Sequence, residues 1–358
     1  MAELLKLMFS KHFVENLASE MAKNSKAFDQ KRFIKEILNT SWDARELKDR
    51  MHHITHRLND CLELDFEKQL NVLDKVSPKF GGFTGMLFPN FVEHYGTNHE
   101  SLSMEALRNY TQYSSSEYAV RPFLKRNPKL IELFYDWSKD KNHHVRRLAS
   151  EGCRPLLPWG MKLEQYVMDP KPVLPILERL KNDPEDYVYR SVANNLNDIS
   201  KHHPQLVLDL GAKWKGKTET TDWVLKHALR TLLKKGNTDA MKIFGFAPDE
   251  NLAILEFSMQ QQTITIGDAT RMKIQVKNTG NEAKFRFEYA ISYLKNNGSH
   301  TDKVFHISEK LMTHNQEEFF DKKLDFKDLS TRRHYPGKHI LSLKVNGVVV
   351  QQIDFMLK

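Results

Sequence analysis

The sequence of 358 residues contains no apolar run long enough to cross a membrane. A transmembrane helix needs about 20 largely apolar residues, and no stretch of that length is free of charged residues here. The N-terminal stretch MAELLKLMFSKHFVENL also lacks the apolar core and small-residue cleavage site of a secretory signal peptide. We therefore expect a cytoplasmic protein that has no membrane partner.

Cysteine is scarce, because Cys61 and Cys153 are the only two in the chain. They stand in different contexts, which excludes a disulfide framework and a cysteine-rich metal cluster. The 16 histidines include the pairs His143-His144 and His202-His203, which we place at loop or helix edges, and they form no convincing ligand set. We expect neither a metal nor a cofactor.

A strongly basic tail is also missing. The net charge of +8 is divided between the two parts of the chain. The last 108 residues hold 16 Lys and Arg against 12 Asp and Glu, and the first 250 hold 38 against 34, so each part carries +4. The basic balance favours a polyanionic partner. Any surface for nucleic acid must be assembled by folding from scattered positions.

What the first 250 residues do contain is helical periodicity with a recurring theme. Apolar residues recur at spacings of three and four, and Ser41 and Asp65 stand where helix N-caps are expected. Four segments each open with an aromatic residue or His, then an apolar residue, then a base: Arg121, Arg147, Arg190 and Lys226. This pattern predicts an all-α, HEAT-like α-solenoid over residues 1–250, with one concave face.

After residue 250, near GFAPDE (245–250), the period changes to two. Seven or eight short stretches alternate apolar and polar residues between turn signals, and Asn346-Gly347 is a strong hairpin signal. No Cys…Trp…Cys framework is present. Strand number and spacing predict an immunoglobulin-like, all-β sandwich as a second domain, residues 251–358.

The segment HHVRRLASEGCRPLLPWG, residues 143–160, carries the first candidate site. Arg147 and Glu151 are one helical turn apart, Gly152 ends the helix, and two prolines bracket the approach to Trp159. An ordinary solvated Arg–Glu pair and a core or staple tryptophan would explain these residues equally well. A groove-facing arrangement is the alternative.

A second polar stripe runs along a neighbouring repeat. Arg190, Asn194 and Asp198 lie at i, i+4 and i+8 in RSVANNLNDI. Because neighbouring solenoid repeats stack their faces side by side, Glu151 and Asp198 would share one groove with flanking arginines. Salt bridges on a solvated face remain the competing interpretation.

Three segments carry a specific resemblance. HHVRRLASEGCRPLLPW, SSSEYAVRPFL and SVANNLNDISKHHP resemble the signature segments of the AlkC group of DNA alkylation repair glycosylases, in the form with a C-terminal immunoglobulin-like domain. The likeness covers essentially the whole helical region. It implies a monofunctional DNA glycosylase that hydrolyses the N-glycosidic bond of cationic N-alkylated bases, N3-methyladenine and N3-methylcytosine, in base excision repair.

The resemblance also implies roles for particular residues. The catalytic carboxylates would be Glu117, Glu151 and Asp198, and Trp159 would pack against the lesion or its deoxyribose. Arg147 and Arg190 would contact phosphates. The full set expected to bind lesion or DNA is Trp159, Arg147, Arg190, Arg121, Arg154 and Lys226. Leu156 and Tyr189 depart from the pattern, since a second basic residue is common at both positions, and this weakens the expected phosphate contacts.

These residue types suit the reaction. An alkylated base is already a cationic leaving group, and carboxylates stabilise the oxocarbenium-like sugar and orient the attacking water. No lysine stands obviously beside the carboxylates, so a Schiff-base lyase step is not predicted. We expect a monomer that acts on double-stranded DNA containing alkylated bases. The alternative is a non-catalytic HEAT-like scaffold whose groove binds nucleic acid or protein.

Overall fold

A computed structural model describes residues 5–246, 251–329 and 332–358. The chain forms two compact units. The first comprises Met1–His203 with Gly216–Ala228, and the second comprises Pro204–Lys215 with Leu229–Lys358. No helix among the described residues is long and apolar enough to span a membrane.

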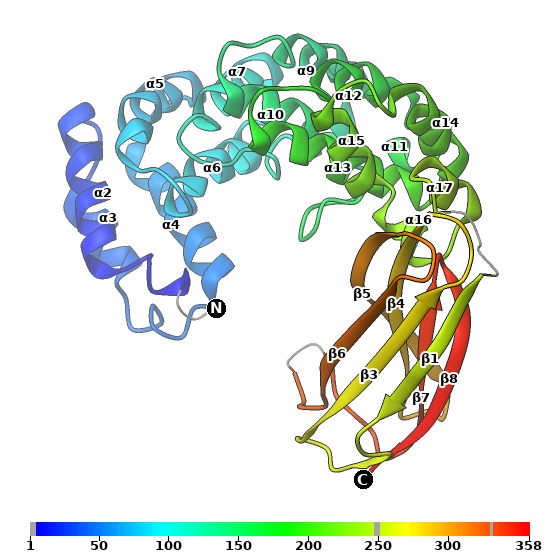
Figure 1. The fold of residues 1–358 in the computed structure, drawn as a ribbon. Helices are drawn as coiled ribbons and strands as arrows, with labels where there is room; N and C mark the ends of the chain where they lie inside the picture. The colour runs from blue at the N-terminus through cyan, green and yellow to red at the C-terminus, as the bar shows by residue number, and fades with distance from the viewer. Residues whose placement is uncertain (1–4, 247–250, 330–331) are drawn as a thin grey trace. The chain divides into compact units, whose positions relative to one another are not determined.

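The described residues of the first unit form helices and the turns between them (Figure 1). Its α-helices are α2 (Lys11–Asn24), α3 (Gln30–Ile37), α4 (Leu47–Leu62), α5 (Phe66–Val76), α6 (Leu87–Tyr95), α7 (Glu100–Tyr110), α8 (Arg121–Arg126), α9 (Ile131–Trp137), α10 (His143–Glu151), α11 (Glu164–Met168), α12 (Leu174–Leu180), α13 (Asp186–Ser200) and α15 (Glu219–Ala228). Short 3-10 turns join them at η1 (Ser77–Lys79), η2 (Thr84–Met86), η3 (Pro128–Leu130) and η4 (Lys171–Val173).

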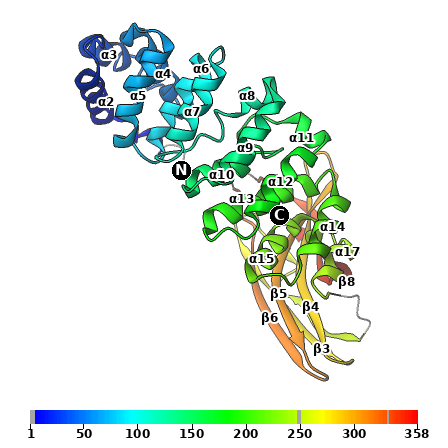
Figure 2. The same cartoon turned by 90° about the horizontal axis from the view of Figure 1, so that it is seen from above.

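Stacked helix pairs confirm the predicted HEAT-like solenoid. Helix α9 packs on α10, and α12 packs on α13, so each pair forms one repeat. Helices α10, α13 and α15 then lie side by side in chain order, as both views show (Figures 1 and 2). The recurring apolar positions form the interior of the stack, with Val145, Leu148, Val188 and Val192 fully buried. This stacking brings the polar faces of α10 and α13 together.

The second unit joins three helices to the β-domain. The helices are α14 (Pro204–Trp214), α16 (Arg230–Lys234) and α17 (Thr238–Ile243). The strands are β1 (Leu252–Met259), β2 (Thr263–Ile264), β3 (Ala269–Asn278), β4 (Ala283–Leu294), β5 (His300–Met312), β6 (Glu317–Asp325), β7 (Gly337–Val345) and β8 (Val348–Leu357).

Two sheets build the predicted sandwich. One has the strand order β1-β3-β6 and the other β2-β8-β7-β4-β5, with antiparallel neighbours except for the short β2–β8 pair. Alternate residues of β3 are buried, including Met272, Ile274 and Val276, and they pack in one apolar core with residues of both sheets. Asn346 and Gly347 both have positive φ, 47° and 83°, as a two-residue hairpin turn requires.

The helical segment nearest the β-domain packs on it. Lys344 Nζ donates to the Lys234 carbonyl, and Lys284 Nζ donates to the Phe244 carbonyl at 3.1 Å. A Cβ on Gly236 would lie 2.5 Å from the Gly347 carbonyl oxygen, so the two backbones are in close contact. The expected boundary between residues 250 and 251 falls beside the segment 247–250, which lies outside the described residues.

Candidate active site

Three carboxylates that are far apart in sequence meet in the first unit. Glu117 lies in the turn before α8, Glu151 is the last residue of α10, and Asp198 lies on α13. Their exposed fractions are 5%, 6% and 2%. Buried carboxylates require partners, because removing a charge from water without compensation is strongly unfavourable.

Two arginines bridge these carboxylates into one chain of ion pairs. Arg147 Nη1 lies 3.0 Å from Glu117 Oε2, and its Nη2 lies 3.6 Å from Glu151 Oε1. Arg154 Nη1 donates to Glu151 Oε1 at 2.7 Å, and its Nε donates to Asp198 Oδ2 at 2.9 Å. Each residue therefore pairs with the next in a chain of alternating charge that runs through Glu117, Arg147, Glu151, Arg154 and Asp198. Arg147 and Glu151 do pair at i,i+4, but inside a larger buried network.

Burial and charge act in opposite directions on the two bridging arginines. Burial disfavours the charged guanidinium, but the adjacent carboxylates outweigh it and raise the pKa of Arg147 and of Arg154 above the ordinary value. Both side chains therefore remain cationic. The Arg147 guanidinium also lies over the Tyr187 ring, 4.8 Å from its centroid.

Hydroxyl groups complete the surroundings of Glu151. Ser191 on α13 donates to Glu151 Oε2 at 2.7 Å, and Ser150 donates to Ser191 Oγ at 2.6 Å. Asn195 fixes this region further by donating to the Ser150 carbonyl at 2.8 Å. Ser150 lies on α10, and Ser191 and Asn195 lie on α13. The sequence contains no pattern that identifies these three residues as partners of Glu151.

A lysine does stand beside the carboxylates, contrary to the expectation from sequence. Lys201 Nζ donates to Asp198 Oδ1 at 3.1 Å, from the residue that follows α13. The i,i+3 spacing from Asp198 to Lys201 was the available signal. The ion pair occupies the amine with a carboxylate rather than leaving it directed at a sugar carbon.

Arg121 holds the backbone of the tryptophan loop and does not line a groove. Its side chain is fully buried, and the guanidinium donates to the carbonyls of Met161, Gly152 and Arg154. Burial lowers the pKa of this guanidinium to about 10. Arg121, which the sequence predicts to contact DNA, thus directs its three guanidinium nitrogens to carbonyl groups inside the protein.

Arg147 and Arg154 are also largely enclosed by the protein. The side chain of Arg147 is 12% exposed and that of Arg154 is 8% exposed, and both are engaged with carboxylates. The structure therefore separates the expected cations into a buried group of three and an exposed group. The buried arginines orient the carboxylates with which they are paired.

Arg190 and Lys226 form the more exposed group. The Arg190 side chain is 54% exposed, pairs with Asp186 at 3.0 Å and lies over the Trp223 ring of α15, 4.9 Å from its centroid. Lys226 lies on α15 and is half-buried. The predicted stripe does run along α13, but Asp198 pairs with Arg154 and Lys201, whereas Arg190 pairs with Asp186.

Trp159 is an exposed residue rather than a core residue. Its exposed fraction is 86% and its backbone φ is +62°, in the left-handed region that non-glycine residues rarely adopt. Such a conformation costs about 1–3 kcal/mol and persists where the surroundings impose it. Here the fully buried Arg121 binds the carbonyls on both sides of the loop.

Gly152 ends α10 for a packing reason. Its φ of −64° is helical, so no left-handed turn requires glycine. A Cβ at this position would lie 2.9 Å from the Leu148 carbonyl oxygen and from side-chain atoms of Phe134 and Val120. Because Gly152 has no side chain, the backbone continues from α10 toward Trp159 without a clash with Phe134 of α9.

The part of the chain that the structure describes contains no group of three His, Cys, Asp or Glu residues that could bind a metal ion. The carboxylates are held instead by arginine, lysine and serine.

Both parts of the chain match known protein families. A family described as "DNA alkylation repair enzyme" matches residues 109–232, and one described as "Uncharacterised protein YhaZ, C-terminal Ig-like domain" matches residues 253–358. The chain is 41% identical to Uncharacterized protein YhaZ of Bacillus subtilis (strain 168), over 99% of each chain. It is 34% identical to Pseudomonas fluorescens alkylpurine DNA glycosylase AlkC, solved bound to DNA containing an abasic site analog, with a TM-score of 0.94 over 99% of each chain.

The chain belongs to the AlkC group of DNA alkylation repair glycosylases. It has the form with an immunoglobulin-like C-terminal domain. The matched DNA alkylation repair segment, residues 109–232, includes all nine residues expected from the AlkC resemblance. The three carboxylates and both of their bridging arginines fall within it.

Proposed function

We propose that this AlkC-group protein is a monofunctional DNA glycosylase that hydrolyses the N-glycosidic bond of cationic N-alkylated bases, N3-methyladenine and N3-methylcytosine, in double-stranded DNA. The observation that carries the proposal is the chain of three buried carboxylates and two arginines beside the exposed Trp159. Its similarity to an alkylpurine DNA glycosylase supports the same reaction class. We expect it to act in the cytoplasm as a monomer.

The proposed reaction is a hydrolysis. The bond between C1′ and the base nitrogen breaks, and its electron pair neutralises the cationic base. The sugar becomes oxocarbenium-like, and a water oxygen then bonds to C1′ while its proton passes to a carboxylate. Because the base leaves as a neutral molecule, general-acid assistance is unnecessary. The protein's contribution is negative charge placed beside the sugar.

We propose a division of this task among the three carboxylates. Glu151 accepts hydrogen bonds from Arg154 and Ser191, and Asp198 accepts from Arg154 and Lys201. Glu117 Oε2 is ion-paired with Arg147 but accepts no well-directed hydrogen bond from the described residues. We therefore assign Glu117 to binding and deprotonating the water. Glu151 and Asp198, with fixed orientation, stabilise the sugar cation.

Trp159, Arg190 and Lys226 serve recognition in this proposal. The ring of Trp159 packs on the lesion or its deoxyribose, and base–aromatic contacts contribute about 1–3 kcal/mol in nucleic-acid complexes. Arg190 and Lys226 contact phosphates. The buried Arg121, Arg147 and Arg154 orient the site and make no DNA contact.

Release of free base from methylated duplex DNA tests the proposal. Purified protein in excess should release N3-methyladenine and N3-methylcytosine, identified by mass spectrometry, well above the loss from DNA incubated without protein. Borohydride should trap no covalent protein–DNA adduct, because Lys201 is held by Asp198 as an ion pair. Tight DNA binding without base release would instead support the scaffold alternative.

A further inference from the structure

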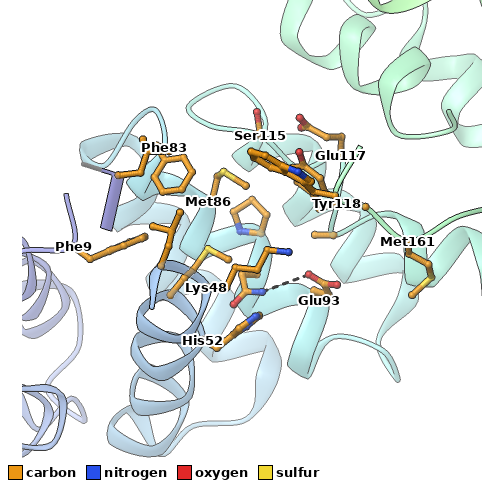
Figure 3. A pocket seen from close by; sticks show the side chains of 18 residues that line it. Phe9, Lys48, His52, Phe83, Met86, Glu93, Ser115, Glu117, Tyr118 and Met161 are labelled. Atoms are coloured by element: carbon orange, nitrogen blue, oxygen red, sulfur yellow. Dashed lines mark hydrogen bonds between the residues drawn. The ribbon is translucent and has the colours of Figure 1, made fainter. Parts of the chain in front are cut away.

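A cavity of about 680 Å³ adjoins the carboxylate chain, and apart from Glu117 and Trp159 its lining residues take no part in the proposed hydrolysis. It lies in the first unit, where α4, η2 and α6 face the segment 115–119 and the loop 159–161. Figure 3 shows Phe9 and Phe83 on one side of it and Glu117 and Met161 on the other. Glu117 and Trp159 line both this cavity and the candidate active site.

The volume exceeds what a bare methylated base requires. A dry protein cavity of about 150 Å³ holds a benzene molecule, and pockets of about 300–1,000 Å³ hold drug-sized ligands. This cavity is in the second range. A single ring with a methyl group would leave most of it unfilled.

The walls select for an apolar guest. Phe9, Met51, Phe83 and Met86 line the cavity, and methionine and aromatic side chains adapt well to flat apolar groups. The lining also includes polar side chains, among them Lys48, His52 and Glu93. Glu93 receives a long hydrogen bond from Asn90, at 3.5 Å, and burial raises the pKa of its carboxyl group.

The charges next to the cavity suit a cationic base. Glu117 belongs to the carboxylate chain and is 5% exposed, and Glu93 supplies a second acid, opposed by Lys48 and His52. A base held between Trp159 and Glu117 would therefore carry its positive charge beside carboxylates, and a substituent on it would point into the apolar space.

We propose that this cavity receives the substituent of lesions whose N-alkyl group is larger than methyl, specifically an apolar ring such as a benzyl group. The inference rests on the proposed glycosylase function and names a broader substrate class for the same site. The base remains beside Trp159 and the carboxylates, and the bond that breaks is the same. Burying the ring in the cavity keeps the larger lesion in the reactive position.

The experiment compares two alkyl groups on otherwise identical duplexes. One duplex is treated with a methylating agent and the other with a benzylating agent, and base release is followed by mass spectrometry under single-turnover conditions. The wild-type protein should release both kinds of base. Met51→Trp and Met86→Trp fill the cavity from α4 and from η2, and each should lower the ratio of benzylated to methylated base release about tenfold.

Asp49→Trp is the matched control. Asp49 is exposed on α4 beside the cavity but does not line it, so the same bulky side chain should leave the ratio at the wild-type value. Thermal melting shows whether each variant is folded. Comparing two cavity variants from different elements guards against one that misfolds.

Three outcomes would overturn the inference. Release of methylated but not benzylated bases would refute it and leave the glycosylase function standing. Release of both, with an unchanged ratio in both cavity variants, would place the substituent outside the cavity. Failure to release methylated bases would refute the proposed function, and the larger substrate class with it.

Discussion

At the scale of single residues, the site depends on charges that compensate one another inside the protein. Glu151 is contacted by Arg147, Arg154 and Ser191, so its orientation is fixed before any DNA arrives. Preorganised groups of this kind stabilise developing charge without having to reorganise during the reaction. Under the proposed function, a substitution in this buried cluster would change both stability and activity, and the two effects must be separated.

The first prediction separates them. Glu117→Gln, Glu151→Gln and Asp198→Asn should each lower the single-turnover rate of base release by about 10²- to 10³-fold, because one preorganised charge is lost. Asp183→Asn is the control, since Asp183 is a buried carboxylate paired with Arg146 at 2.6 and 2.9 Å outside the cluster. It should lower the melting temperature comparably but leave the rate near wild type. Equal losses of rate in all four variants would return the carboxylates to a purely structural role.

The second prediction uses the backbone conformation of Trp159. Trp159→Ala and Trp159→Gly should both weaken discrimination between damaged and undamaged DNA, by about 1–3 kcal/mol. The glycine variant should be more stable to unfolding than the alanine variant by about 1 kcal/mol, because glycine adopts a φ of +62° without steric penalty. Denaturant unfolding and competitive binding measure the two effects. Greater stability of the alanine variant would contradict the proposed strain.

At the scale of the element, the solenoid presents corresponding positions of α10, α13 and α15 in a row. Arg147 of α10 lies over the ring of Tyr187 on α13, and Arg190 of α13 lies over the ring of Trp223 on α15. In both cases the aromatic residue that stands three positions before a base packs on the preceding base. The repeat theme in the sequence is a consequence of this stacking, although Arg147 is buried and Arg190 is exposed.

The third prediction concerns this exposed position. If Arg190 contacts a phosphate, Arg190→Ala should reduce the slope of log K against log salt by about 0.9. Lys129, exposed on η3, is the matched control, and Lys129→Ala should leave the slope unchanged. The measurement is DNA affinity over a range of salt concentrations. An unaltered slope in a folded Arg190 variant would leave it as a helix-surface ion pair with Asp186.

At the scale of the whole molecule, the β-domain is packed together with the helices that precede it. Because α14, α16 and α17 belong to the same compact unit as the sandwich, cutting the chain at residue 250 would expose surfaces that are buried. Substitution is therefore a sounder test of this domain than truncation.

The fourth prediction tests whether the β-domain assists DNA binding. Arg332 lies over the Tyr293 ring and Arg333 lies over the Tyr335 ring. Lys327 and Lys338 are nearby in the sequence. Arg332→Ala combined with Arg333→Ala should weaken duplex affinity severalfold, while the single-turnover rate at saturating protein stays near wild type. Lys358→Ala, at an exposed position outside the strands, serves as control. Unchanged affinity in the double variant would exclude this arginine pair as a DNA contact.

The sequence by itself determined the classes of structure and several local details. Periods of 3.6 and 2 depend only on which side chains face the core, so the solenoid and the sandwich were both predictable. Asp65 caps α5 by accepting from the Lys68 amide, as expected. Ser41 was the wrong choice for α4, which begins at Leu47 after Glu46 without a side-chain cap. Local capping competes with packing, and packing decided there.

Only the tertiary structure decided which charged residues are buried and what each one contacts. Arg121, Arg147 and Arg190 look equivalent in the sequence theme, yet one binds carbonyls, one bridges carboxylates and one stays exposed. The cavity beside Glu117 joins α4 and η2 to a loop more than 70 residues later, and no local pattern encodes it. Partners of a buried charge are set by long-range packing, because the free energy of desolvation is balanced by whichever groups the fold brings within hydrogen-bonding distance.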